Sequence, residues 1–351
     1  MTNTNPSSHN QVISIAKGIG ITLMVVGHSG CPNYLHDFIY SFHMVLFYFL
    51  SGYFFREDKI TKNSCGYIFK KIRGLYFPYV KWSVLFILLH NFFFDIGFND
   101  NFLTNREMWV NIKRSLRGLY QGEHFLGAYW FLISLLQVFL LFSAIIWLKN
   151  ILKYNHFEKF AVGTLFLIGI LSNEMGVDLS IKRELMVLPF YYLGFLGGNR
   201  KFVYTETFYK ISFIVCFPIL LVQAFYIQTA VGGNNYGPYY AYLLSSICGI
   251  VLVISISELL QNSTMGRLFD KLGKYTLHVM TFHFLGFKIL SALIINTLGM
   301  PFVLIRKWPV PDELNSFWLL YSAFGLIFSV CLVFIGKKIK SLSHNFSIHN
   351  E

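Results

Sequence analysis

Two apolar segments near the start of the chain carry polar side chains that a purely structural membrane helix would avoid. Lys17 and His28 lie in the first segment, and His43 and Ser51 lie in the second. Eleven residues at about 100° each bring Lys17 and His28 to one face of a helix, about 16 Å apart along its axis. Because burying an ionisable group in lipid is costly, these residues predict a polar path through a bilayer.

The imidazole of His28 is suited to proton transfer, since an unperturbed histidine titrates at about pH 6.5 and is largely neutral at pH 7. Two structural interpretations compete with this one. Lys17, near a helix start, can reach the lipid headgroups by snorkelling. A single histidine in a membrane helix can also be a packing residue whose hydrogen bonds are satisfied.

Membrane-spanning helices must position these residues. The 351-residue chain is 55% apolar and 13% charged, whereas roughly 25% of a soluble domain is charged. Its apolar runs of about 17 to 23 residues match a bilayer crossing. The sequence therefore predicts an all-α, polytopic membrane protein with about ten transmembrane helices. Their expected ranges are 11–29, 37–55, 75–94, 128–148, 160–172, 185–198, 207–230, 239–260, 275–297 and 315–335.

The basic residues predict the orientation of these helices. A net charge of +12 would suit a nucleic-acid partner, but Lys and Arg cluster in loops between the apolar runs, as the positive-inside rule describes. We therefore expect no nucleic-acid binding, and both termini in the cytoplasm. The expected organisation is a disordered tail at 1–10, a membrane domain at 11–336 and a cytoplasmic tail at 337–351. The five cysteines show neither a disulfide framework nor a metal-binding pattern.

Several motifs occur together in the first two segments: Lys17-Gly-Ile-Gly, Val-Val-Gly27-His28, Phe42-His43-Met44 and Leu50-Ser51-Gly52-Tyr53. This set resembles the acyltransferase-3 family of membrane O-acyltransferases, most closely its fucose 4-O-acetylase-like branch. The family opens with Arg or Lys, ten residues, then His, and Lys17 and His28 meet this spacing. Members often carry Asp three residues before the basic residue, where this chain has Ser14. If that Asp orients the basic residue, another group must do so here.

The resemblance implies transfer of an acetyl group from cytoplasmic acetyl-CoA to a carbohydrate hydroxyl. The acceptor would be a surface polysaccharide, a lipid-linked glycan or a precursor, the location the bacterial cytoplasmic membrane, and no metal would take part. Such transfer needs a base, a donor site and stabilisation of an oxyanion. His28 is the expected base or a transient acyl carrier. His43 and Ser51 are further catalytic candidates, although Ser51-Gly52 is also typical of small-residue helix packing.

A basic motif precedes the third expected helix. Lys70, Arg73 and Pro78 resemble a family motif in which two Arg, often separated by two other residues, are followed by Pro. Together with Lys17, Lys70 and Arg73 would bind the phosphates of coenzyme A through charge-assisted hydrogen bonds. Plain topology is the competing interpretation, because basic loops such as 56–73 occur in every polytopic protein.

Tyr53, Trp130 and His283 complete the candidates, as substrate-binding residues. Trp130 lies in a family-like Tyr-Trp-Phe-Leu motif, although an interfacial aromatic belt explains it equally well. Many members continue with a Glu in this helix, which the chain lacks. His278 and His283 lie about 140° apart on a helix, so only one faces a given site, and the family pattern favours His283.

Residues 107–120 alternate apolar and basic positions at helical spacing. This pattern predicts an amphipathic helix on the membrane surface with lipid as its partner, or else a cover for the acceptor site. A different function class is also open: a transporter or flippase for a glycan or small molecule would carry intramembrane Lys and His as well. Transporters usually contain an internal repeat, which is not evident here, and coenzyme A binding would separate the two classes.

Overall fold

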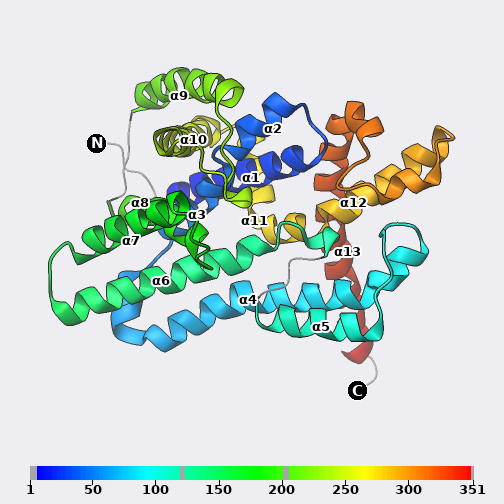
Figure 1. Ribbon diagram of the computed structural model, residues 1–351, viewed down its shortest axis with the longest axis horizontal. Helices are drawn as coiled ribbons and strands as arrows, with labels where there is room; N and C mark the ends of the chain where they lie inside the picture. The colour runs from blue at the N-terminus through cyan, green and yellow to red at the C-terminus, as the bar shows by residue number, and fades with distance from the viewer. Residues whose placement is uncertain (1–5, 119–122, 201–204, 349–351) are drawn as a thin grey trace.

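The computed structural model describes residues 6–118, 123–200 and 205–348, and these residues form an all-helical protein (Figure 1). Within these ranges the only β pairing is an isolated bridge between Ala230 and Asn235. The helices are α1 Pro6–His28, α2 Asn33–Tyr40, α3 His43–Tyr53, α4 Glu57–Asp95, α5 Asn105–Leu116, α6 Trp130–Leu152, α7 Phe157–Glu174, α8 Lys182–Arg200, α9 Glu206–Tyr226, α10 Tyr239–Leu260, α11 Thr264–Lys274, α12 Thr276–Thr297 and α13 Trp318–Ile348, with short 3-10 helices η1 His124–Leu126, η2 Val231–Gly233, η3 Phe302–Arg306 and η4 Asp312–Phe317.

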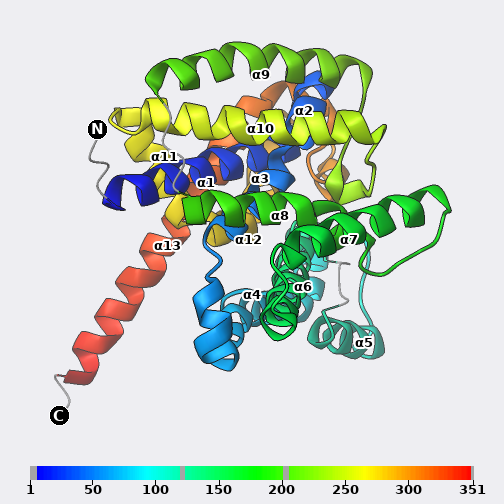
Figure 2. The same cartoon turned by 90° about the vertical axis from the view of Figure 1, so that its left-hand side faces the viewer.

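The helices fall into two groups that cross each other. Helices α4 and α6 lie along the plane of Figure 1 and are seen nearly end-on in Figure 2. Helix α10, with α9 packed beside it, is seen nearly end-on in Figure 1 and lies along the plane of Figure 2. Helices α1 and α3 lie between the groups. Close contact holds α3 against α8, since a Cβ at Gly52 would lie 1.9 Å from the Tyr191 carbonyl oxygen. This packing fixes the position of α3, whose first residue is His43 and whose last residue is Tyr53. Both are predicted site residues.

Seven of the described helices are long and apolar enough to cross a membrane: Gln11–His28, Glu57–Asp95, Trp130–Leu152, Glu206–Tyr226, Tyr239–Leu260, Thr276–Thr297 and Asp312–Lys338. The protein is therefore a polytopic, all-helical membrane protein. The other three expected crossings correspond to the shorter or more polar helices α3, α7 and α8.

The expected single helix at 37–55 is wrong, because the chain breaks into α2 and α3 at Ser41–Phe42. Phe42 leaves helical geometry at φ −145° and ψ −22°. Its side chain is buried between Phe38 and α10, where a Cβ at Gly249 would lie 2.2 Å from the Cβ of Phe42. The Ser41 hydroxyl donates to the Phe38 carbonyl at 2.8 Å. Tertiary burial of one aromatic side chain thus interrupts an apolar run that reads as continuous.

Two expected loops are also helical. Residues 57–73 continue α4 across a kink at Asn63, where φ is −155°; Lys149 of α6 binds Glu57 at 3.0 Å and helps to hold this basic segment in place. Between α10 and α12, the Ser263 hydroxyl accepts from the Gly266 amide and starts α11, which packs against α1. Packing partners supply the stability that these polar segments lack as isolated helices.

Parts of both expected tails are helical. Helix α1 begins at Pro6, inside the expected disordered tail at 1–10, and α13 continues to Ile348, inside the expected tail at 337–351. Residues 1–5 and 349–351 of those predictions lie outside the described residues. In Figure 2, the C-terminal part of α13 extends away from the other helices.

The amphipathic segment does form a helix, α5, over residues 105–116; residues 119 and 120 of the prediction lie outside the described ranges. A capping box starts it, in which the Thr104 hydroxyl accepts from the Glu107 amide and the Glu107 carboxylate accepts from the Thr104 amide. These bonds lower the pKa of Glu107, since they favour its ionised form. Trp109 and Leu116 remain exposed.

Candidate active site

A cavity of about 490 Å³ lies where α1, α3, α4, α6 and α12 meet. Five of the predicted site residues line it, although they come from three helices. They are Lys17, His28, His43, Ser51 and Trp130.

Helix α1 contributes one continuous stripe to this cavity. Between Lys17 and His28, Ile21 and Met24 also line it, which is the spacing of a single helical face. The predicted shared face of Lys17 and His28 is therefore present. The Lys17 ammonium lies 4.4 Å from the centre of the Phe54 ring. This aromatic ring therefore contacts the basic residue in a chain that has Ser14 where family members often carry Asp. Ser14 itself donates to the Asp270 carbonyl oxygen at 3.2 Å.

Two imidazoles lie at the His28 end of the cavity. His28 Nδ1 lies 3.0 Å from the Tyr40 hydroxyl, and Tyr40 in turn contacts His43, with ring centres 4.9 Å apart. His43 Nδ1 lies 2.9 Å from the Ile39 carbonyl oxygen. A carbonyl oxygen only accepts, so Nδ1 of His43 carries the hydrogen and Nε2 carries the lone pair. The neutral His43 is thus in a form that can accept a proton.

Tyr40 is a site residue that the sequence analysis missed, because a single tyrosine after a turn gives no signal. A tyrosine hydroxyl is neutral at physiological pH and can both donate and accept a hydrogen bond.

The His283 ring packs against the His28 ring. The two rings stack with their centres 5.6 Å apart, and the His283 side chain is fully buried. Its Nδ1 donates to the Val279 carbonyl at 2.9 Å, and within the described ranges its Nε2 has no hydrogen-bond partner. His283 is close enough to support His28, whereas the cavity wall on this helix is made by its neighbours Thr276, Leu277 and Met280.

The basic motif of α4 presents a different residue from those predicted. Lys70 and Arg73 are exposed and do not line the cavity, whereas Lys71, Gly74 and Leu75 do. Lys71 lies within electrostatic range of Lys17 and its ammonium is 5.5 Å from the Phe139 ring centre. The i, i+3, i+4 spacing of this face could have identified Lys71, had the segment been taken as helical.

Trp130 forms a further wall with a residue the sequence analysis did not consider. The Arg183 guanidinium stacks 4.2 Å over the Trp130 ring and donates to the carbonyls of Val231 and Gly232 at 3.3 and 3.2 Å. Both of these loop residues line the cavity. Arg183 therefore holds the tryptophan and the loop in one arrangement.

Tyr53 lies apart from this group. It lines a second, mostly apolar cavity of about 270 Å³ between α1, α8, α9 and α10, together with Glu258 and Gly197. Tyr53 is at the end of α3 opposite His43, and it does not line the cavity that contains His28.

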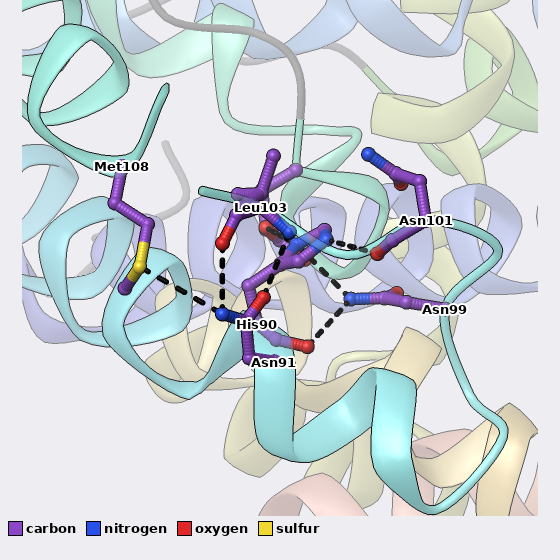
Figure 3. A network of polar contacts seen from close by, with 7 residues as sticks. His90, Asn91, Asn99, Asn101, Leu103 and Met108 are labelled. Carbon is purple, nitrogen blue, oxygen red and sulfur yellow. Dashed lines mark hydrogen bonds and ion pairs between the residues drawn. The ribbon is translucent and has the colours of Figure 1, made fainter. Parts of the chain in front are cut away.

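A second polar cluster surrounds His90 of α4 (Figure 3). His90 Nε2 lies 3.0 Å from the Asn101 carbonyl oxygen, and Nδ1 lies 2.9 Å from the Glu123 carboxylate. The Asn99 amide donates to the His90 carbonyl at 3.3 Å. All three side chains are buried. Because the Asn101 carbonyl can only accept, Nε2 carries hydrogen. Nδ1 has two polar neighbours, the Glu123 carboxylate and, at 3.1 Å, the amide nitrogen of Asn99.

Taken together, the cavity combines proton-accepting imidazoles with two lysines, a set of groups able to remove a proton and to bind an anion. No curated protein and no solved structure matches the chain. A family model described as an acyltransferase domain, Acyl_transf_3, matches residues 10–336. The match covers most of the chain, so this protein belongs to the acyltransferase-3 family and is a membrane enzyme that transfers acyl groups.

Proposed function

We propose that this protein is a membrane O-acetyltransferase that moves an acetyl group from cytoplasmic acetyl-CoA to a hydroxyl of a cell-surface or lipid-linked carbohydrate. One observation carries the proposal. A single cavity has imidazoles at one end, His28 and His43, and lysines at the other, Lys17 and Lys71. Lys17 and His28 are about 16 Å apart along α1, so a long donor can be held by its charged end while its thioester reaches the base.

The donor end would recognise the phosphates of coenzyme A. The ammonium groups of Lys17 and Lys71 lie over aromatic rings, which leave the ammonium hydrogens for an anion. Lys70 and Arg73 lie on the exposed side of the same turns of α4 and would meet the outer part of the nucleotide. The Ser51 hydroxyl lines the cavity as well and offers a donor for the thioester or its oxyanion.

At the other end, His28 would take the proton of the acceptor hydroxyl as its oxygen attacks the thioester carbon. The new C–O bond forms, the C–S bond breaks, and the imidazolium returns its proton to the thiolate of coenzyme A. In the alternative route, His28 attacks first and carries the acetyl group to the hydroxyl. His43, whose Nε2 holds a lone pair, is the second imidazole available for proton transfer.

The acceptor would enter from the side opposite the donor, past Trp130 and the loop that Arg183 holds. A carbohydrate acceptor agrees with the fucose 4-O-acetylase-like resemblance of the first two segments. Under this proposal both termini are cytoplasmic, α3, α7 and α8 complete about ten crossings, and the enzyme lies in a bacterial cytoplasmic membrane.

The test uses membranes that contain the wild type or His28→Ala at equal expression, with acetyl-labelled coenzyme A and a glycan extract. We expect label in the glycan fraction with the wild type and not with the variant. Equal transfer by both would move the chemistry to His43 or His283. If neither binds coenzyme A nor transfers label to any of a range of glycans, a transporter would be the better account.

A further inference from the structure

Among the described residues, Tyr40 is the only side chain hydrogen-bonded to His28, and three features hold its ring in place. His36 stacks on it with ring centres 3.8 Å apart, and His36 Nδ1 lies 3.0 Å from the Asp37 carboxylate. The other carboxylate oxygen of Asp37 accepts from Gln228 at 2.8 Å, which ties α2 to the segment before the cavity loop.

Helix α1 makes room for this contact. A Cβ at Gly27 would lie 2.8 Å from Cε2 of Tyr40, closer than real Cβ contacts, so any larger residue at this position would push the ring away. The Gly27-His28 pair thus does two things: His28 supplies the imidazole, and Gly27 lets the Tyr40 hydroxyl reach Nδ1 of that imidazole.

We propose that Tyr40 is a positioning residue for His28: its hydroxyl oxygen accepts a hydrogen bond from Nδ1–H and thereby keeps the lone pair on Nε2, the nitrogen left to meet the substrate. This inference rests on the proposed function, in which His28 is the base. In the neutral base and in the imidazolium formed after proton transfer, Nδ1 carries a hydrogen. One acceptor at Tyr40 therefore serves both states without rearrangement, as a base-orienting group should.

The assignment separates Tyr40 from the other groups around His28. His283 stacks on the ring and His43 contacts Tyr40 rather than His28, while Phe284 packs on the ring at 4.9 Å. These neighbours shape the pocket, but among the described residues only Tyr40 is bonded to a nitrogen of His28.

The decisive measurement is a double-mutant cycle of acetyl transfer with Tyr40→Phe and His28→Ala. Tyr40→Phe keeps the ring and should lower kcat about tenfold, the rate equivalent of one neutral hydrogen bond, with KM for both substrates within about twofold. In the His28→Ala background it should change nothing, because its effect acts through His28. Equal losses in both backgrounds, or an unchanged kcat in the single variant, would overturn the proposal.

Tyr321→Phe is the matched control. It also removes a buried hydroxyl, which bonds Ser291 at 2.8 Å, and Tyr321 does not line the cavity. It should leave kcat unchanged, while the thermal stability of both Phe variants reports any folding defect. A tenfold loss in the control as well would show that hydroxyl removal acts through general destabilisation.

A second readout does not need acetyl transfer. Diethyl pyrocarbonate acylates the unprotonated imidazole nitrogen, and mass spectrometry follows the His28 peptide with the His43 peptide as internal reference. Tyr40→Phe should slow modification of His28 relative to His43, because Nδ1–H loses its acceptor. If the wild type transfers no acetyl group, the proposed function fails, and an unchanged modification ratio would separately reject the role of Tyr40.

Discussion

The His28 cavity and the His90 cluster both contain histidines, but the hydrogen bonds of these side chains differ. At His43 and His283, Nδ1 donates to the backbone carbonyl four residues earlier and Nε2 is left with a lone pair. At His90, both nitrogens have polar partners, which are the Asn101 carbonyl at Nε2 and the Glu123 carboxylate and Asn99 amide at Nδ1. A cavity-lining histidine with an unbonded nitrogen, such as His43, can take part in chemistry, whereas His90, buried with partners at both nitrogens, stabilises the fold.

The lysines show the same difference. Lys17 and Lys71 line the cavity against aromatic rings. Lys288 is fully buried, and its ammonium donates to the carbonyls of Ile305 and Lys307. Buried cations with bonded hydrogens hold α12 to the loop that follows it, while the cavity lysines keep their hydrogens for a ligand.

The largest expected effect is on acetyl transfer and concerns His28 in the cavity. His28→Ala should lower acetyl transfer by about 10²- to 10⁴-fold, the usual contribution of a general base, and should leave the thermal midpoint within about two degrees. His90→Ala should do the reverse, with a lower midpoint and unchanged kcat per folded molecule. Comparable rate losses in both variants would mean that His28 and His90 do not differ in their contribution to catalysis.

The next effect is on stability and concerns the buried pair of His90 and Glu123. Glu123→Ala should lower the free energy of unfolding by about 3–5 kcal/mol, because it leaves His90 buried without its partner. Thermal unfolding in detergent measures this change, and Asp178→Ala, at an exposed carboxylate, is the matched control. A Glu123 variant as stable as the wild type would show that the buried pair contributes nothing net.

A third variant pair sharpens the contrast between the lysines. Lys71→Ala should weaken coenzyme A binding roughly tenfold, about the loss of one charge-assisted hydrogen bond, whereas Lys70→Ala should change it less than about twofold. Calorimetric titration of purified protein gives both values. The opposite order would place the nucleotide on the exposed side of α4 and favour Lys70 and Arg73 as the main donor contacts.

The smallest effect concerns the exposed carboxylate at the start of α5. The folded state lowers the pKa of Glu107 below its ordinary value of 4.5, so the cap contributes fully above pH 4.5 and is lost as the pH falls through the lowered pKa. Amide protection of α5, corrected for intrinsic exchange, should therefore fall at low pH. In Thr104→Val, which removes the hydroxyl, protection should be lower and less dependent on pH; protection that rises on acidification would contradict this.

The sequence by itself determined the membrane character, the helical fold class and the shared face of Lys17 and His28. These follow from composition and from helical periodicity, which depend only on residues close together in the chain. The motif that identified the family lies in the same short segment, so the acyl-transfer chemistry was also predictable. His43 and Ser51 were predicted from the same motifs, and Trp130 from a separate Tyr-Trp-Phe-Leu motif; all three line the cavity.

Tertiary structure alone decided which side chains meet. Burial of Phe42 splits the second apolar run and frees Tyr40 to reach His28, twelve residues away. Packing of α4 against α6 makes the basic segment helical and turns Lys71, rather than Lys70 or Arg73, into the cavity. These outcomes depend on contacts between distant segments, whose packing energies outweigh the local preferences that a sequence displays.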